Sequence, residues 1–171
     1  MNKQFDIKLA EARWVLGLTP IEELPALAEN ALADGIESES ILRLAVCSVG
    51  EIDEITRLFK RILVEAGGGN MLKIEALKYY AKQIATQILS SEISPQQGVR
   101  LIWTATINAK EKDFHELDAF IYAASEMDDR PADKEFFEQA ILEEAKRWCE
   151  AGQEPNSIAE EQRDPSKKTI Q

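Results

Sequence analysis

The stretch EIDEITRLFKRILVEAGGG, residues 51–69, largely decides the fold class. Its apolar residues recur at the three- and four-residue spacing of an amphipathic helix, and three consecutive glycines then end the helix. The residues predicted to face inward are Ile52, Ile55, Leu58, Phe59, Ile62 and Leu63. The same periodicity occupies most of the chain, and no segment shows strand-like alternation. The sequence therefore predicts an all-α fold of about eight helices.

Working outward, the other helices are expected at residues 3–16, 19–34, 38–47, 71–90, from 94, from 113 and at 131–150. Side chains that can satisfy the free backbone N–H groups of a first turn mark several of these starts. The predicted capping pairs are Thr19 with Glu22, Ser94 with Gln97 and Asp113 with Glu116, and Ser38 is expected to cap a further helix. Each cap predicts a helix that begins sharply after a turn.

Residues 27–45 resemble residues 84–102 at an offset of 57, with five identities that include Ala28 with Ala85 and Arg43 with Arg100. A real duplication would favour stacked helical hairpins of the α-solenoid kind. A coincidence of helical stripes would leave an irregular bundle. Both architectures stay open at this point.

Composition divides the 171 residues into a helical domain, residues 1–151, and a polar tail, residues 152–171. The tail contains two prolines and no apolar stripe, so we expect it to be disordered in solution. Cys47 and Cys149 lie in helical, largely apolar contexts that are typical of small buried side chains. The sequence leaves open whether the two thiols meet.

The formal charge of -11 is unevenly distributed: residues 1–50 carry -4, residues 51–110 carry +2 and residues 111–171 carry -9. An acidic chain is a poor match for phosphate backbones or anionic membranes. No run of about 18 apolar residues predicts a membrane span. Asp6 and Glu11 interrupt what would be the apolar region of a secretory signal, so we expect a cytoplasmic protein.

His115 is the only histidine, and this restricts the chemistry that the chain can perform. Its sequence HELDA lacks the second histidine of a zinc protease, because Ala119 occupies that position. A ferritin-like iron site needs two histidines. The glycines at 67–69 follow a helix and precede no Gly-Lys-Ser/Thr, so they do not form a phosphate loop. We predict no enzyme activity, no metal and no cofactor.

Acidic residues gather around the expected start of the last helix: Asp128, Asp129, Asp133, Glu135 and Glu138. They are interpreted either as a solvated, well-capped helix start or as a surface for a basic protein partner. Tyr79 is predicted to be an exposed interface anchor, because its neighbour Tyr80 takes the apolar stripe. Trp14, Trp103 and Trp148 are predicted to lie in the core.

Three segments together, residues 16–45, 51–67 and 81–103, resemble a loosely defined group of small all-helical bacterial proteins of unknown activity. Some proteins of this general kind are immunity proteins or antitoxins, which implies a binding role at the level of class and transfers no site residue. The leading hypothesis is a protein that masks a basic toxin with its acidic face. The alternative is a helical-repeat adaptor or regulatory scaffold that binds a peptide segment.

Overall fold

The computed structural model describes residues 5–151, and this part of the chain is helical without a β-strand. The all-α prediction is confirmed. Eight α-helices are present in these residues: α1 (Ile7–Val15), α2 (Leu24–Ala33), α3 (Glu39–Ala45), α4 (Ile52–Glu65), α5 (Lys73–Leu89), α6 (Pro95–Ala109), α7 (Asp118–Asp129) and α8 (Lys134–Glu150). Short 3₁₀ turns precede α2 (Ile21–Glu23) and α8 (Pro131–Asp133). The predicted tail begins where the described residues end.

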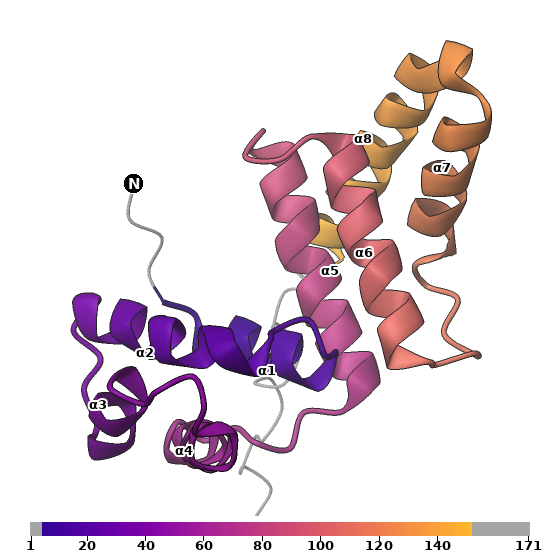
Figure 1. Cartoon of the computed structure of the whole chain (residues 1–171). Helices are drawn as coiled ribbons and strands as arrows, with labels where there is room; N and C mark the ends of the chain where they lie inside the picture. Colours follow the sequence, from indigo (N-terminus) through magenta and orange to yellow (C-terminus); the bar gives the residue numbers. More distant parts are fainter. Residues whose placement is uncertain (1–4, 152–171) are drawn as a thin grey trace, which may run out of the picture.

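The helices form two groups, α2–α4 and α5–α8, that lie side by side (Figure 1). Each group has its own hydrophobic core. The N-terminal core lies among α2, α3 and α4, and the C-terminal core lies among α5, α6, α7 and α8. Helix α1 runs between them, since Ala10 belongs to the N-terminal core whereas Ala12 and Leu16 belong to the C-terminal core. One nine-residue helix therefore joins the two halves of the fold.

Two of the predicted helix starts are confirmed in detail. The Ser38 hydroxyl accepts a hydrogen bond from the Ile41 N–H at 3.2 Å. At α6, the Ser94 hydroxyl accepts from the Gln97 N–H at 3.2 Å, and the Gln97 side chain accepts from the Ser94 N–H at 3.1 Å. These caps depend only on residues three apart, which is why the sequence predicts them well.

The other two predicted capping pairs are wrong. Helix α2 begins at Leu24 and not at Pro20, and the buried Thr19 hydroxyl has no hydrogen-bond partner. A helix starting at Pro20 would place Pro25 in its interior, where the ring clashes with a backbone carbonyl. Helix α7 begins at Asp118 without a side-chain cap. Glu116 is unavailable there because its carboxylate forms an ion pair with Lys78 at 2.6 Å.

Two side chains predicted to face inward, Ile52 and Trp103, are exposed instead, and so is the apolar Phe136 of α8. Phe136 is 71% exposed, Ile52 48% and Trp103 38%. In α8 the buried residues Phe137, Ile141 and Ala145 repeat every four positions, so Phe136 points away from their stripe. Ile52 is one of four exposed apolar side chains between positions 42 and 52, together with Leu42, Val46 and Val49. Trp14 does pack against the N-terminal core and Trp148 against the C-terminal core.

The internal correspondence reappears as two helical hairpins, α2–α3 and α5–α6, whose helices contact each other. The turns of the two hairpins correspond at an offset of 56 residues, whereas the five sequence identities correspond at an offset of 57 residues. Gly35 and Ser91 both have a positive φ, and Ser38 and Ser94 cap the second helix of each pair. This arrangement is consistent with the predicted stack of helical hairpins. That the two hairpins arose by duplication stays a prediction.

Both cysteines are free. Cys47 packs against the N-terminal core and Cys149 against the C-terminal core, so the two thiols do not meet. Burial, followed by Glu51 and Glu54, raises the pKa of the Cys47 thiol. A raised pKa disfavours the reactive thiolate, in keeping with a structural side chain.

Candidate functional site: an acidic surface at the α7–α8 turn

The five predicted acidic residues come together around the turn from α7 to α8, at the top of Figure 1. Helix α7 ends at Asp129, Arg130 and the 3₁₀ turn follow, and α8 starts at Lys134. We call this set the acidic surface: Asp128, Asp129, Asp133, Glu135 and Glu138. The first four side chains are exposed and Glu138 is half-buried.

Only part of this negative charge is neutralised within residues 5–151. Arg100 reaches across from α6 to the Asp128 carboxylate at 2.8 Å, and Lys134 lies 3.6 Å from the Glu138 carboxylate. Asp129, Asp133 and Glu135 form no ion pair with any described residue. Three exposed carboxylates around one turn are therefore free to attract a cation from outside.

Phe136 lies next to these carboxylates along α8 and is the side chain that sequence reasoning missed. Its ring meets the buried Phe137 ring edge to face at 5.4 Å between centroids, while most of its own surface stays in solvent. Aromatic anchors surrounded by polar groups are typical of binding hot spots. The doublet Phe136-Phe137 alone does not show which ring is exposed, since adjacent helical residues such as Leu58 and Phe59 are both buried in one core. The four-residue spacing of the buried positions of α8 passes through Phe137 and leaves Phe136 outside.

Tyr79 is not the exposed anchor that the sequence predicts. Helix α1 lies against α5, and the Tyr79 hydroxyl donates to the Asp6 carboxylate at 2.7 Å. The Lys8 ammonium lies 4.7 Å from the centre of the Tyr79 ring. Burial, followed by the Asp6 carboxylate, raises the pKa of Tyr79 to about 12. This residue fastens α1 to α5 and is not part of the acidic surface.

A groove of about 730 Å³ lies along α5. Its walls come from α1, the loop 67–71, α5 and the last turn of α8. Apolar surface is supplied by Met71, Tyr79 and Trp148. Three lysines and three glutamates also line the groove: Lys8, Lys78, Lys82, Glu11, Glu75 and Glu116. The groove is thus chemically distinct from the acidic surface.

The triple glycine forms one end of this groove. The Glu11 carboxylate of α1 is buried and accepts hydrogen bonds from the Gly69 N–H at 2.7 Å and the Met71 N–H at 3.1 Å. A Cβ on Gly68 would collide with the Glu11 carboxylate. The absence of a side chain at Gly68 therefore allows the Glu11 carboxylate of α1 to lie close to the glycine loop of the same chain.

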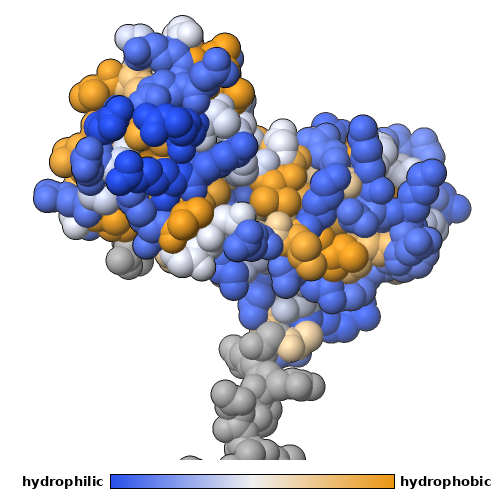
Figure 2. All heavy atoms as spheres, turned by 90° about the horizontal axis from the view of Figure 1, so that it is seen from below, coloured by the Kyte–Doolittle hydropathy of each residue, from blue (hydrophilic) through white to orange (hydrophobic). Residues whose placement is uncertain are grey.

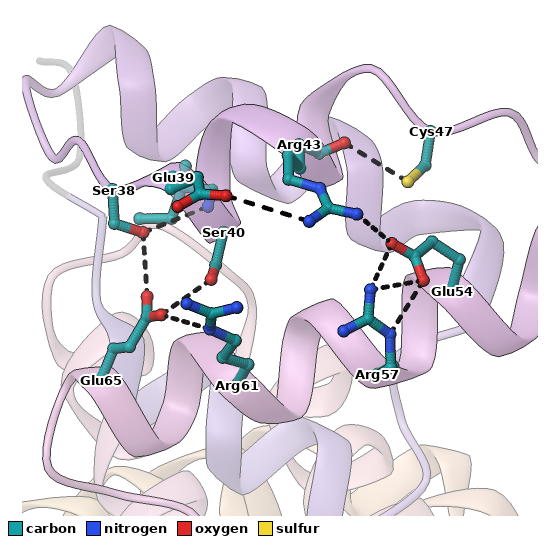
Figure 3. A network of polar contacts seen from close by, with 10 residues as sticks. Ser38, Glu39, Ser40, Arg43, Cys47, Glu54, Arg57, Arg61 and Glu65 are labelled. Atoms are coloured by element: carbon teal, nitrogen blue, oxygen red, sulfur yellow. Dashed lines mark hydrogen bonds and ion pairs between the residues drawn. The ribbon is translucent and has the colours of Figure 1, made fainter.

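A polar network joins α3 to α4 (Figure 3). Ser38 and Ser40 donate to the Glu65 carboxylate at 3.1 and 2.8 Å, and Arg43 donates to Glu54 at 2.9 Å. The Ser40 hydroxyl, followed by Arg61, holds the pKa of Glu65 below its usual value. Arg57 does the same to the pKa of Glu54. These contacts hold two helices together, and their groups satisfy one another.

His115 lies exposed in the loop before α7, with one ring nitrogen 3.0 Å from the Asp118 carboxylate. No group of three or more His, Cys, Asp or Glu side chains within residues 5–151 is arranged to hold a metal ion. No helix in the same range has both the length and the apolar character that a membrane span requires. Figure 2 shows exposed apolar side chains as separate patches among hydrophilic ones.

The chain matches no protein-family model, no curated protein and no solved structure.

Proposed function

We propose that this protein is a non-enzymatic binding module of the immunity or antitoxin type. Its acidic surface covers a basic region of a cognate protein and keeps the substrate of that protein out. Such a mechanism needs no chemistry from the binder, because occupancy alone removes the target's activity.

The observation that carries the proposal is the position of Phe136. It is 71% exposed next to Asp129, Asp133 and Glu135, none of which forms an ion pair with a described residue. An aromatic side chain can fill a pocket on the partner, and the carboxylates around it can pair with Lys or Arg. The combination supports a basic protein as partner.

The charge distribution adds a kinetic argument. Residues 111–171 carry 17 Asp and Glu against 8 Lys and Arg. A field of one sign steers an oppositely charged protein toward the correct face and accelerates association. The interaction is expected to weaken as salt concentration rises, since salt screens exposed charges.

The alternative function is an adaptor or regulatory scaffold that binds a peptide segment. The groove along α5 favours it, because a concavity of about 730 Å³ with Met71 and Trp148 in its walls can accept a short chain segment. The two functions use different surfaces and therefore respond to different substitutions.

Photo-cross-linking from the acidic surface tests the proposal. A photoreactive phenylalanine analogue is placed at position 136 in cells of the source organism, and at the exposed Ile107 of α6 as a control. We expect one basic protein to be captured from position 136 and not from position 107, and co-expression of the chain to restore growth of cells that make that protein. Capture of an acidic protein, or the same products from both positions, would refute the proposal.

A further inference from the structure

The groove along α5 starts where the described chain stops. Ala151, which follows the last residue of α8, lines the groove together with Trp148. Residues 152–171 continue from this point. The groove therefore reaches the last described residue of the chain.

Two of the groove's cations lack an acidic partner among the described residues. Lys78 is engaged by Glu116 at 2.6 Å, whereas Lys8 contacts the Tyr79 ring and Lys82 forms no ion pair. Each of the three carboxylates that line the groove has a partner in the described residues. Glu116 pairs with Lys78, Glu11 accepts from the N–H groups of Gly69 and Met71, and Glu75 accepts from the N–H of Leu72. The groove thus offers two ammonium groups to an incoming anion.

The segment EPNSIAEE, residues 154–161, has matching chemistry. It carries three carboxylates, Glu154, Glu160 and Glu161, with no Lys or Arg, and Ile158 is its aliphatic side chain. Carboxylates can pair with Lys8 and Lys82, and an aliphatic group can cover the apolar wall near Trp148. Charge and hydropathy both agree with the groove.

The connection is long enough. Residues 152–161 can extend over about 34 Å. The part of α5 that lines the groove, from Glu75 to Lys82, measures about 10 Å along the helix axis. A tethered segment of this length is present at an effective concentration on the order of millimolar, so weak contacts suffice for occupancy.

We propose that the groove is a binding site for an acidic segment and that its occupant is residues 154–161 of the same molecule. Glu160 and Glu161 pair there with Lys8 and Lys82, and Ile158 packs against the wall formed by Trp148. This inference goes beyond the proposed function, because it concerns a different surface and a different ligand.

Hydrogen–deuterium exchange of the full chain at low salt tests the proposal. A synthetic peptide of residues 152–171 supplies the unprotected reference rates. In the wild-type chain, amides 154–161 are expected to exchange about tenfold more slowly than in the peptide. Glu160→Lys with Glu161→Lys should abolish this protection without touching residues 5–151, and so should Lys8→Glu with Lys82→Glu.

A charge swap separates recognition from damage to the fold. Combining all four substitutions should restore protection, and Lys60→Glu with Lys146→Glu, neither of which lines the groove, should leave it unchanged. Peptide-like exchange in the wild-type chain would overturn the proposal and leave the groove to a partner's segment. Protection that falls on dilution would also overturn it, by assigning the segment to a second copy. The acidic surface at α7–α8 is intact in every variant, so neither result bears on the proposed function.

Discussion

The Glu11 carboxylate accepts a hydrogen bond from the Gly69 N–H at 2.7 Å, across 58 positions of sequence. This contact ties α1 to the loop that carries the chain from α4 into α5. Because α1 contributes to both hydrophobic cores, the contact holds the connection between the two halves of the fold. The arrangement at this junction depends on the absence of a side chain at Gly68.

Gly68→Ala is therefore expected to destabilise the protein by about 1–3 kcal/mol, since the new Cβ would collide with the Glu11 carboxylate. Gly50→Ala is the matched control, because nothing lies within 4 Å of its Cβ position and its φ is not positive. That substitution should leave stability unchanged or raise it by up to about 1 kcal/mol. Urea unfolding of the two variants measures the difference, and equal effects would contradict the close approach.

The two adjacent phenylalanines of α8 are expected to respond oppositely to truncation. Phe137→Ala should cost about 3–5 kcal/mol, because the side chain is buried in the C-terminal core. Phe136→Ala should change the free energy of unfolding by less than about 0.5 kcal/mol, because the ring is mostly in solvent. Chemical denaturation of both variants shows whether Phe137 faces the core and Phe136 the solvent. A larger loss of stability from Phe136→Ala would contradict this orientation of α8.

Tyr79 gives the stability an alkaline dependence. The folded pKa of about 12 lies above the ordinary value of 10.0, so the stabilisation is fully present below pH 10 and is lost as the pH rises toward 12. Tyr79→Phe removes the hydrogen bond to Asp6 and should cost about 1 kcal/mol at neutral pH. The difference between wild type and variant should shrink between pH 10 and 12 in unfolding titrations. A difference that stays constant over this range would be inconsistent with the Tyr79–Asp6 hydrogen bond.

The α3–α4 network predicts an acid titration. The Ser40 hydroxyl, followed by Arg61, lowers the pKa of Glu65, so its carboxyl resonance should titrate below the ordinary value of 4.5. In Ser40→Ala the pKa should move back toward that value, because the 2.8 Å hydrogen bond is lost. Carboxyl-carbon NMR measures both midpoints. The stability that this carboxylate contributes is present above pH 4.5 and is lost as the pH falls through the lowered pKa.

The sequence predicts those features that depend on neighbouring residues. Ser38 and Ser94 cap their helices as expected, and the helical class follows from periodicity alone. The pair Thr19–Glu22 fails because Pro25, six residues away from Thr19, dictates where α2 can begin. A capping pair therefore predicts a helix start correctly unless another nearby residue, here a proline, restricts where the helix can begin.

The candidate site shows more clearly which features cannot be predicted from neighbouring residues in the sequence. The five acidic residues lie between positions 128 and 138, so their grouping is foreseeable from the sequence. Tyr79 is not the exposed anchor that the sequence predicts, because α1 lies across α5 and covers it, whereas Phe136 stays 71% exposed. The contact of Glu11 with Gly69 joins distant segments and has no counterpart in any local pattern.

The affinity of the protein cross-linked at position 136 tests the central claim most directly. Asp129→Lys, Asp133→Lys and Glu135→Lys together are compared with a control of identical charge change, Glu22→Lys, Glu29→Lys and Glu37→Lys, at three exposed positions of the N-terminal half. Calorimetric titration should show a loss of about 100-fold for the first variant and little change for the second. Equal losses would show that net charge alone drives binding, and undiminished affinity in the first variant would contradict a role for the acidic surface.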